Sequence, residues 1–239
     1  GYKLVTTDYS TFEMRIMAEL SGDPGLISAF QKGIDVHSHT AALMFGLEFT
    51  DDFAEKYPKE RFAAKSINFG LMYGRGPISL ARQLGISPEK GKEYLEKYFK
   101  SYPGVRDYLD RVAKEAVKRG WSTTPAGRKR WYVKPDKTDP EYSKKIGEIE
   151  RQAKNHPIQG TNADAIKYAL VFLSEKIKEK NFDASIILTV HDEVVCEVRE
   201  DQAEEWAKIQ SEELQRAGRL FIKKVPVESK PFIGDVWEH

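Results

Sequence analysis

The sequence predicts an α+β fold, in which an antiparallel sheet with flanking helices is combined with a helical subdomain. Two observations lead to this prediction. The strongest strand patterns lie near the two ends of the 239-residue chain, whereas helical periodicity dominates the part between them. A stretch rich in glycine and proline, residues 119–140, separates two groups of helices. Terminal strands that meet in one sheet would leave the middle of the chain to form a helical lobe.

The first half of the chain is expected to contain one strand followed by helices. The strand covers residues 3–7 and ends at Asp8. A helix follows over residues 11–20, because its apolar side chains recur at helical spacing, and the segment 21–24, Ser-Gly-Asp-Pro, ends it. Further helical segments are expected over residues 26–30, 36–45, 59–73, 78–84, 89–98 and 105–118.

The second half is expected to contain the remaining strands. Two short paired strands are predicted within the glycine- and proline-rich stretch, and a hairpin is predicted around His191-Asp192-Glu193, because two apolar runs flank that tight turn. The predicted strands cover residues 121–123, 130–133, 186–190, 194–198 and 225–233. The predicted helices cover residues 141–155, 163–180 and 200–217.

The composition excludes several classes of protein. Hydrophobic residues make up 40% and charged residues 31%, which is typical of a globular chain. A single cysteine, Cys196, excludes a disulfide framework and a cysteine-rich zinc module. No apolar run approaches the ~20 residues that span a bilayer, and the N-terminus has no signal-peptide pattern. We therefore expect neither a membrane protein nor a secreted one.

Local charge differs from the overall balance. The chain has 38 basic and 37 acidic residues, so its net charge of +1 does not indicate a nucleic-acid partner. Residues 114–137, however, contain eight basic side chains against two acidic ones, a net of +6. Arg128 and Arg130 lie there among aromatic residues, which suits contact with a nucleic-acid backbone. An ordinary solvated loop is the alternative.

Two aspartates are candidates for metal binding. Asp8 ends the first predicted strand and Asp192 lies on the predicted hairpin turn. Carboxylates held close together by strand ends can coordinate Mg²⁺ ions, which take their remaining ligands from water and substrate phosphates. Taken singly, Asp8 could also cap the following helix, and Asp192 could be an ordinary turn residue.

A stripe of four residues on the 59–73 helix suits a nucleotide. Arg61, Lys65, Phe69 and Tyr73 follow one another at intervals of four, which places them on one helical face. The two cations would reach phosphates, and the two aromatic rings would face a sugar and a base. A solvated basic turn followed by two core aromatics would give the same spacing.

Taken in order, these segments resemble the family A DNA polymerases, the bacterial DNA polymerase I type. Residues 8–15, DYSTFEMR, resemble the first palm motif of that family, and residues 190–193, VHDE, resemble its second carboxylate motif. The helix stripe with Asn68, Gly70 and Gly74 resembles its fingers-helix motif. Residues 25–46 and 151–164 match further segments in the same order, so the resemblance extends over residues 1–237.

The resemblance implies a catalytic centre for nucleotidyl transfer. Asp8 and Asp192 would bind two Mg²⁺ ions, for which Mn²⁺ can substitute, and the Tyr9 carbonyl would be a third oxygen ligand. One ion would lower the pKa of the primer 3′-hydroxyl and the other would hold the triphosphate and the departing pyrophosphate. Lys65 is implied as a further catalytic residue.

The resemblance also implies contacts with nucleotide and DNA. Arg61, Lys65 and His37 would contact the triphosphate, Phe69 the incoming sugar and base, and Tyr73 the template position. Glu13 would block a ribose 2′-hydroxyl and pair with Tyr73. The minor groove or template would be contacted by Arg151, Asn155, Gln159 and His191, with Glu193 as an acidic neighbour.

Two departures from the family pattern are visible. Thr11 and Phe12 replace the usual Gln and Ile, and Phe12 would lie near the nucleotide's sugar. The chain also starts one strand before Asp8, without the thumb that precedes this motif in the family. We expect residues 1–30 and 121–239 to form the palm and residues 31–120 the fingers, with a missing N-terminal portion in the same or a separate chain.

The predicted function is template-directed DNA synthesis in replication or repair. The partners would be primer-template DNA and deoxynucleoside triphosphates, in the cytoplasm near the nucleoid or in a host cell if the source is viral. A single-subunit RNA polymerase shares part of the helix motif, although Phe69 and Glu13 argue against it. A non-catalytic nucleic-acid-binding fragment is the third possibility, disfavoured because both carboxylates and the whole stripe are kept.

Overall fold

The computed structural model describes residues 1–72 and 74–237. The chain divides into two compact units. Unit 1 consists of Gly1–Ile16 and the chain from Gln159 onward, and unit 2 of Met17–Ile158. The long helix α9 (Tyr142–Lys180) and the helix α1 (Phe12–Ser21) each contribute residues to both units.

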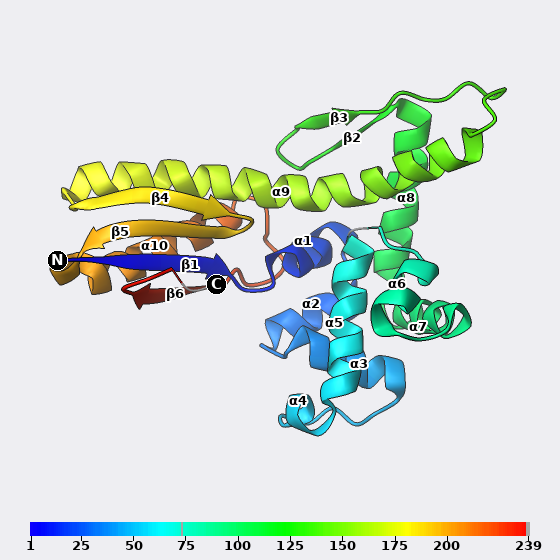
Figure 1. The fold of residues 1–239 in the computed structure, drawn as a ribbon, viewed down its shortest axis with the longest axis horizontal. Coiled ribbons are helices and arrows are strands. Elements are labelled where there is room, and N and C mark those ends of the chain that lie inside the picture. Colours follow the sequence, from blue (N-terminus) through cyan, green and yellow to red (C-terminus); the bar gives the residue numbers. More distant parts are fainter. Residues whose placement is uncertain (73, 238–239) are drawn as a thin grey trace. The chain divides into compact units, whose positions relative to one another are not determined.

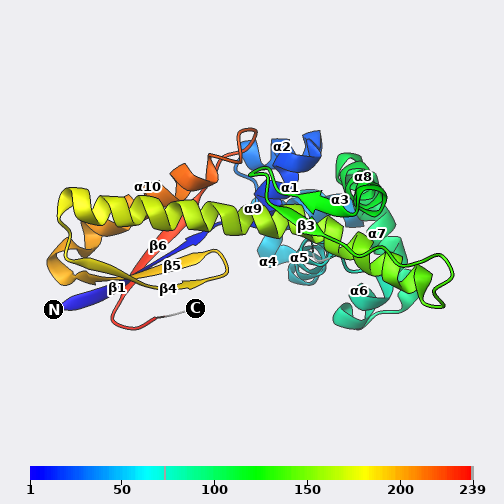
Figure 2. The same ribbon diagram turned by 90° about the horizontal axis from the view of Figure 1, so that it is seen from above.

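Unit 1 is built on a four-stranded sheet with strand order β4-β5-β1-β6 (Figures 1 and 2). The strands are β1 (Tyr2–Tyr9), β4 (Ala184–Val190), β5 (Glu193–Arg199) and β6 (Ser229–Gly234). Each neighbouring pair is antiparallel. The first strand of the chain therefore lies between two strands from its C-terminal third, as the expected α+β arrangement requires.

The helix α10 (Ala203–Gly218), which follows the short 3-10 turn η1 (Glu200–Gln202), packs on one face of this sheet. Trp206 is completely buried there, and its indole nitrogen donates to Gln210 at 2.7 Å. The Gln210 amide in turn donates to the carbonyls of Val5 and Val194 at 3.2 and 2.8 Å. A buried polar group is tolerated when its hydrogen bonds are made, so Gln210 joins α10 to β1 and β5.

Unit 2 is mostly helical. Its helices besides α1 and α9 are α2 (Pro24–Gln31), α3 (Val36–Phe45), α4 (Phe53–Lys56), α5 (Pro58–Met72), α6 (Pro77–Leu84), α7 (Pro88–Ser101) and α8 (Pro103–Arg119). Asp23 caps α2 by accepting from Leu26 N at 3.0 Å and also accepts from Gly104 N in α8 at 2.9 Å. One carboxylate thus fastens two helix N-termini, which carry unsatisfied N–H groups. No helix within the described residues is long and apolar enough to cross a membrane.

The predicted pair of short strands is confirmed as β2 (Trp121–Thr123) and β3 (Lys129–Trp131), with Trp121 opposite Trp131. The Ser122 hydroxyl lies 2.7 Å from the Tyr132 hydroxyl and 2.8 Å from Nδ1 of His156 on α9. These bonds hold the hairpin against the N-terminal part of α9.

The two helices predicted over residues 141–155 and 163–180 are wrong as separate elements, because α9 continues through Pro157. Proline removes one intrahelical donor and crowds the preceding turn, which normally ends a helix. Ala153, Ile158 and Ala165 on either side of it are completely buried. Their packing holds the helical path through Pro157, which local propensity alone does not predict.

The close approach of α6 and α7 depends on Gly91. A Cβ atom at this position would lie 2.6 Å from the Pro77 carbonyl oxygen and 3.0 Å from the Ala81 Cβ. Gly91→Ala should lower the free energy of unfolding of the chain by about 1–3 kcal/mol, because the backbone must move to relieve the clash. Urea denaturation followed by circular dichroism measures this change.

Gly147→Ala is the matched control, since Gly147 lies within α9 and a Cβ there would meet nothing within 4 Å. This substitution should stabilise the chain by up to about 1 kcal/mol through helix propensity. Equal effects of the two substitutions would contradict the steric explanation for Gly91.

Candidate active site

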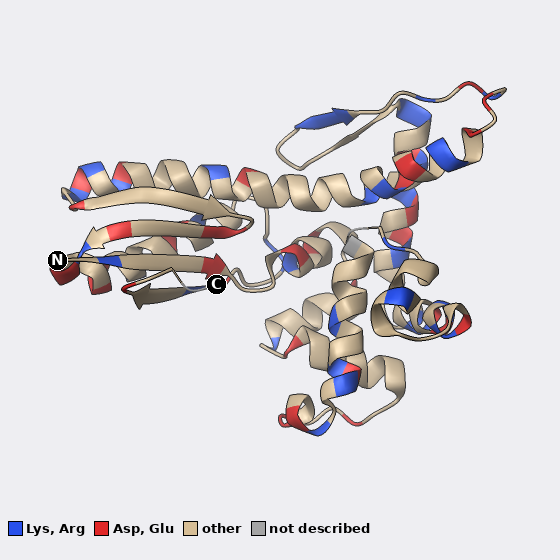
Figure 3. Ribbon diagram, in the orientation of Figure 1, with Lys and Arg blue, Asp and Glu red and all other residues tan. Residues whose placement is uncertain are grey.

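The two candidate metal-binding aspartates lie at the same end of neighbouring strands in unit 1. Asp8 is the penultimate residue of β1 and is opposite Glu193, the first residue of β5. Asp192 immediately precedes Glu193 in the β4–β5 turn. Acidic colour accordingly marks the ends of both strands (Figure 3). The register of one strand pair therefore brings together carboxylates that are 184 residues apart in the sequence.

The turns next to or containing these aspartates have unusual backbone geometry. His191 and Asp192 form a two-residue hairpin loop between the paired residues Val190 and Glu193, and His191 has a φ of 52°. Thr11, which follows β1, has a φ of 51°. Positive φ is costly for residues other than glycine and is concentrated at functional sites.

Glu13 is a buried carboxyl close enough to Asp192 in unit 1 to be affected by its charge. Burial and the charge of Asp192 together raise the pKa of the Glu13 carboxyl to about 7. Its Oε2 atom is buried with no hydrogen-bond partner in the described part of the chain. A carboxyl destabilised in this way would be relieved by a nearby cation.

The donor set fits Mg²⁺ better than a metal that needs a complete protein cage. Asp8 and Asp192 supply hard oxygen ligands, and Mg²⁺ commonly keeps waters and substrate phosphates as its other ligands. Among the described residues, no group of three or more His, Cys, Asp or Glu side chains could hold a metal ion. Cys196 is completely buried beside α10 and contributes to the core of the sheet.

The side chains of Tyr9 and Phe12 belong to the core. The Tyr9 hydroxyl donates to the Leu214 carbonyl on α10, and its ring stacks on Phe12 with centroids 4.0 Å apart. Phe12 is only 1% exposed, so its ring belongs to the core of unit 1, and its expected place near a sugar stays a prediction. Because the Tyr9 side chain is bonded in the core, only its backbone carbonyl could bind a metal ion.

Glu193 lies in a strand and not in the turn, which corrects the predicted hairpin. It is 5% exposed, and the Trp237 indole nitrogen donates to its Oε1 at 2.7 Å. Sequence reasoning gave Trp237 no role, since a tryptophan near the end of the printed sequence carries no recognisable pattern. The structure shows that it holds a carboxylate adjacent to Asp192.

The predicted stripe on α5 in unit 2 is present for its described members. Arg61 is partly exposed, Lys65 is exposed and Phe69 is half-buried. The Lys65 ammonium lies 6.0 Å from the centroid of the Phe69 ring, and the His37 ring lies 5.7 Å from it. Tyr73 lies outside the described residues. The described part of the stripe therefore places two cations and one aromatic ring next to one another on α5.

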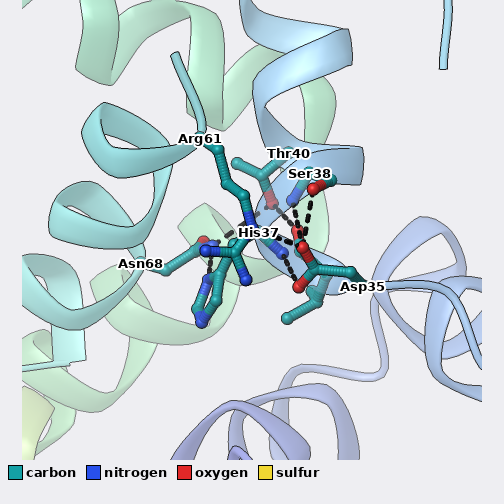
Figure 4. Close-up of polar contacts among 7 residues, drawn as sticks. Asp35, His37, Ser38, Thr40, Arg61 and Asn68 are labelled. Carbon is teal, nitrogen blue, oxygen red and sulfur yellow. Dashed lines mark hydrogen bonds and ion pairs between the residues drawn. The ribbon is translucent and has the colours of Figure 1, made fainter. Parts of the chain in front are cut away.

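Arg61 is held by Asp35, the N-cap of α3 (Figure 4). The Asp35 carboxylate accepts from the Arg61 Nε at 2.7 Å and from the Ser38 hydroxyl at 2.6 Å. Burial opposes the charge of Asp35, but these bonds lower the pKa of its carboxyl below the usual value. The Arg61 guanidinium therefore points in a defined direction, with Nε bonded to Asp35 and the terminal nitrogens without a hydrogen-bond partner among the described residues.

His37 and Asn68 form a buried pair between α3 and α5. His37 is 3% exposed and Asn68 is completely buried. Burial is the main cause that lowers the pKa of His37 to about 4, with the charges of Arg61 and Lys65 acting in the same direction against Asp35. Asn68 Nδ2 lies 2.9 Å from His37 Nδ1. Sequence reasoning left Asn68 without a role, because its partner on α3 is 31 residues away.

The candidate DNA-contacting residues are distributed over both units. Arg130 is exposed on β3 and donates to Gln152 on α9 at 2.9 Å, and Arg128 is partly exposed in the β2–β3 loop. Lys129 lies 4.6 Å from the Trp121 ring and 5.7 Å from the Trp131 ring. Basic colour covers β3 in Figure 3. The other candidates are Arg151, Asn155 and Gln159 at four-residue intervals on α9, and the exposed His191.

The sequence profile described as DNA polymerase family A matches residues 1–239. This chain belongs to DNA polymerase family A. It is 43% identical to DNA polymerase I of Pseudomonas aeruginosa over 209 residues, which cover 86% of this chain and 22% of that protein. It is 40% identical to DNA polymerase I of Caldicellulosiruptor bescii over 227 residues, covering 95% and 26% respectively. The thermostable DNA polymerase I of Thermus filiformis is also 40% identical, over 99% of this chain and 27% of that protein.

A solved structure has the same fold. The polymerase domain of Pol1 from M. smegmatis, in complex with DNA primer-template and dNTP, matches with a TM-score of 0.88 and 39% identity. The match covers 98% of this chain and 40% of that one. The predicted family and the α+β fold class are thus confirmed. The chain spans about a quarter of the length of the curated relatives that it matches.

The depressed pKa of His37 predicts a loss of stability in acid. The unfolded state binds this proton near the ordinary histidine pKa of 6.5, whereas burial lowers the pKa of the folded state to about 4. The free energy of unfolding should therefore be highest above pH 6.5 and fall by up to about 3 kcal/mol as the pH drops to 4. Urea titrations across this range measure how steeply the free energy of unfolding falls with pH. His37→Gln should make this fall less steep than in the unaltered chain. An unchanged slope in the variant would contradict the assignment.

Proposed function

We propose that this chain carries the catalytic centre for template-directed DNA synthesis, the addition of deoxynucleotides to a primer 3′-hydroxyl. The observation that carries the proposal is the placement of Asp8 and Asp192 at adjacent strand ends in a member of DNA polymerase family A. The cation-aromatic stripe on α5 supports it, and so does the similar structure, which is a complex with DNA primer-template and dNTP. The parts named in the proposal are a palm, residues 1–30 and 121–239, and helical fingers, residues 31–120.

Asp8 and Asp192, with the carbonyl oxygen of Tyr9, would hold two Mg²⁺ ions, and Mn²⁺ could replace them. Such ions, when bound, acidify the attacking hydroxyl and stabilise the charge of the departing pyrophosphate. Asp8 is exposed at the end of β1, so its carboxylate is accessible to an ion and to substrate. The neighbouring Glu193 is fastened by Trp237 and would act through the local field rather than as a ligand.

The α5 stripe would bind the incoming nucleotide. Arg61 and Lys65 would neutralise the triphosphate, with Lys65 close to the reacting phosphate, and His37 would donate a hydrogen bond to it. Phe69 would pack against the sugar and base, and Tyr73 would stack at the template position. In unit 1, Glu13 would exclude a ribose 2′-hydroxyl and thereby favour deoxynucleotides.

DNA would be held by the basic hairpin and by polar residues of α9. Arg128 and Arg130 would contact backbone phosphates, because they lie in the segment with a net charge of +6. Arg151, Asn155, Gln159 and His191 would reach the template or the minor groove near the new base pair. The remaining partner would be an N-terminal portion that carries a thumb, as the relatives' greater length suggests.

Removing either candidate metal ligand should abolish synthesis. Asp8→Ala and Asp192→Ala should each lower primer extension by roughly three orders of magnitude, since bound metal contributes several kcal/mol to such reactions. The assay uses the chain fused behind the N-terminal portion of a bacterial relative. Asp201→Ala, which removes an exposed carboxylate on unit 1, is the control and should keep full activity. Extension that persists in either test variant would exclude the metal assignment.

The same assay separates DNA from RNA synthesis. With Glu13 intact, deoxynucleotides should be incorporated far more readily than ribonucleotides, and Glu13→Ala should narrow the difference. Equal use of both nucleotide types by the unaltered chain would favour an RNA polymerase. Binding of DNA without incorporation of either type would favour a non-catalytic module.

DNA affinity should depend on salt through the basic hairpin. Arg128→Ala and Arg130→Ala should each weaken binding to primer-template DNA and reduce the slope of log K against log salt concentration by about 1, as expected for one lost phosphate contact. Fluorescence anisotropy at several salt concentrations gives both quantities. Lys208→Ala, an exposed cation on α10, is the matched control and should leave the slope unchanged. Identical slopes in all variants would remove the hairpin from the DNA contact.

A further inference from the structure

A chain of hydrogen bonds behind the α5 stripe determines where protons lie. The Thr40 hydroxyl oxygen is 2.7 Å from the Val36 carbonyl, which can only accept a hydrogen bond. The single hydroxyl proton of Thr40 is therefore committed to Val36. Toward every other neighbour, Thr40 Oγ1 must act as an acceptor.

This commitment fixes the orientation of the Asn68 amide. The Asn68 atom 3.3 Å from Thr40 Oγ1 must be a donor, which identifies it as the Nδ2 amino group. The reverse orientation would place the amide oxygen against a hydroxyl oxygen that has no proton to offer. Tyr102, whose hydroxyl is 3.1 Å from Thr40 Oγ1, must likewise donate there.

The orientation of Asn68 in turn fixes the state of His37. The same Nδ2 group lies 2.9 Å from His37 Nδ1, so Nδ1 must accept and cannot carry a proton (Figure 4). In a neutral imidazole the proton then resides on Nε2. Burial keeps the ring neutral at physiological pH by lowering its pKa to about 4. No partner of Nε2 is found in the described part of the chain.

We propose that Asn68 is a positioning residue that fixes the His37 tautomer, so that the Nε2–H group donates to the triphosphate of the incoming nucleotide. A phosphate oxygen can only accept. The opposite tautomer would present a lone pair to it and would repel it. A neutral donor also adds no charge beside Arg61 and Lys65, whose charges already act on His37. The inference rests on the proposed function only for the identity of the acceptor.

The orientation of the Asn68 amide lowers the stability of the fold, which supports a functional reason for it. Asn68 is completely buried, and its Oδ1 has no hydrogen-bond partner among the described residues. A buried carbonyl oxygen without a partner lowers stability, and such groups call for an explanation. Here the amide oxygen has no hydrogen bond, whereas the amide nitrogen donates to both Thr40 and His37.

The tautomer can be observed directly in the 239-residue chain. Long-range nitrogen–proton correlation spectra of ¹⁵N-histidine-labelled protein at pH 7.5 distinguish protonated from unprotonated ring nitrogens, and the loss of signals in His37→Gln assigns the residue. We expect the proton on Nε2 in the unaltered chain. Asn68→Asp replaces the donor by an acceptor and should move the proton to Nδ1. A proton on Nδ1 in the unaltered chain, or no change in Asn68→Asp, would overturn the proposal.

A second pair of variants tests the same series of hydrogen bonds without adding charge. Thr40→Val removes the acceptor that orients the amide and should give a mixture of both tautomers, whereas Thr40→Ser keeps the hydroxyl and should rescue the single Nε2–H form. Thermal unfolding checks that both remain folded. A single Nε2–H form in Thr40→Val would show that Thr40 does not orient Asn68, which overturns the stated mechanism.

Nucleotide binding separates this inference from the proposed function. Calorimetric titration should give a dissociation constant for dTTP that is about three- to tenfold higher in Thr40→Val than in Thr40→Ser, as expected for one weakened hydrogen bond to a charged group. Deoxythymidine, which lacks phosphates, should bind equally to both variants. Equal losses of affinity for dTTP and for deoxythymidine would show that Asn68 has only a structural role. Absence of dTTP binding by the unaltered chain would refute the nucleotide role, while the tautomer measurement would stand on its own.

Discussion

The position of β1 between β5 and β6 is the constraint on which the rest of unit 1 depends. Side chains alternate along a strand, and Tyr9 directs its hydroxyl into α10. Asp8 therefore faces the opposite side of the sheet, level with Glu193 and Lys230. A slip of one residue would bury the Asp8 carboxylate against α10 and expose Tyr9. The buried apolar residues of β1 and β5 exclude such a slip, so the core of the sheet also positions the chemistry.

Charge is distributed between the two units according to what each would hold. Unit 1 places carboxylates near one another, and burial together with the charge of Asp192 raises the pKa of Glu13 to about 7. Unit 2 presents cations on α5 and on the β2–β3 hairpin, and uses Asp35 to direct Arg61. Cations near polyanionic phosphates and acids near metal ions follow the same electrostatic rule with opposite sign. The total of +1 hides this division, because the two groups nearly cancel.

Much of the fold follows from local pattern. The helix predicted over residues 36–45 has the bounds of α3, and the structure gives the local reasons: Asp35 caps its N-terminus, and Gly46 takes the left-handed conformation that ends helices. Two apolar runs beside a tight turn predict the hairpin of β4 and β5. Pro157 misled the prediction of α9, because proline's local effect is large and the packing that overrides it involves residues distant in the sequence.

The candidate site likewise combines features that the sequence encodes with features that only folding creates. By itself, the sequence determined the family, the pair of aspartates and the spacing of the α5 stripe, because each of these depends on residue type at a fixed interval. Only the tertiary structure decided that Trp237 holds Glu193, that Asp35 directs Arg61, and that Thr40 and Asn68 set the proton on His37. A hydrogen bond is directional and forms only between atoms that folding brings within about 3 Å of each other. That proximity depends on how separate elements pack, and no interval along the chain encodes it.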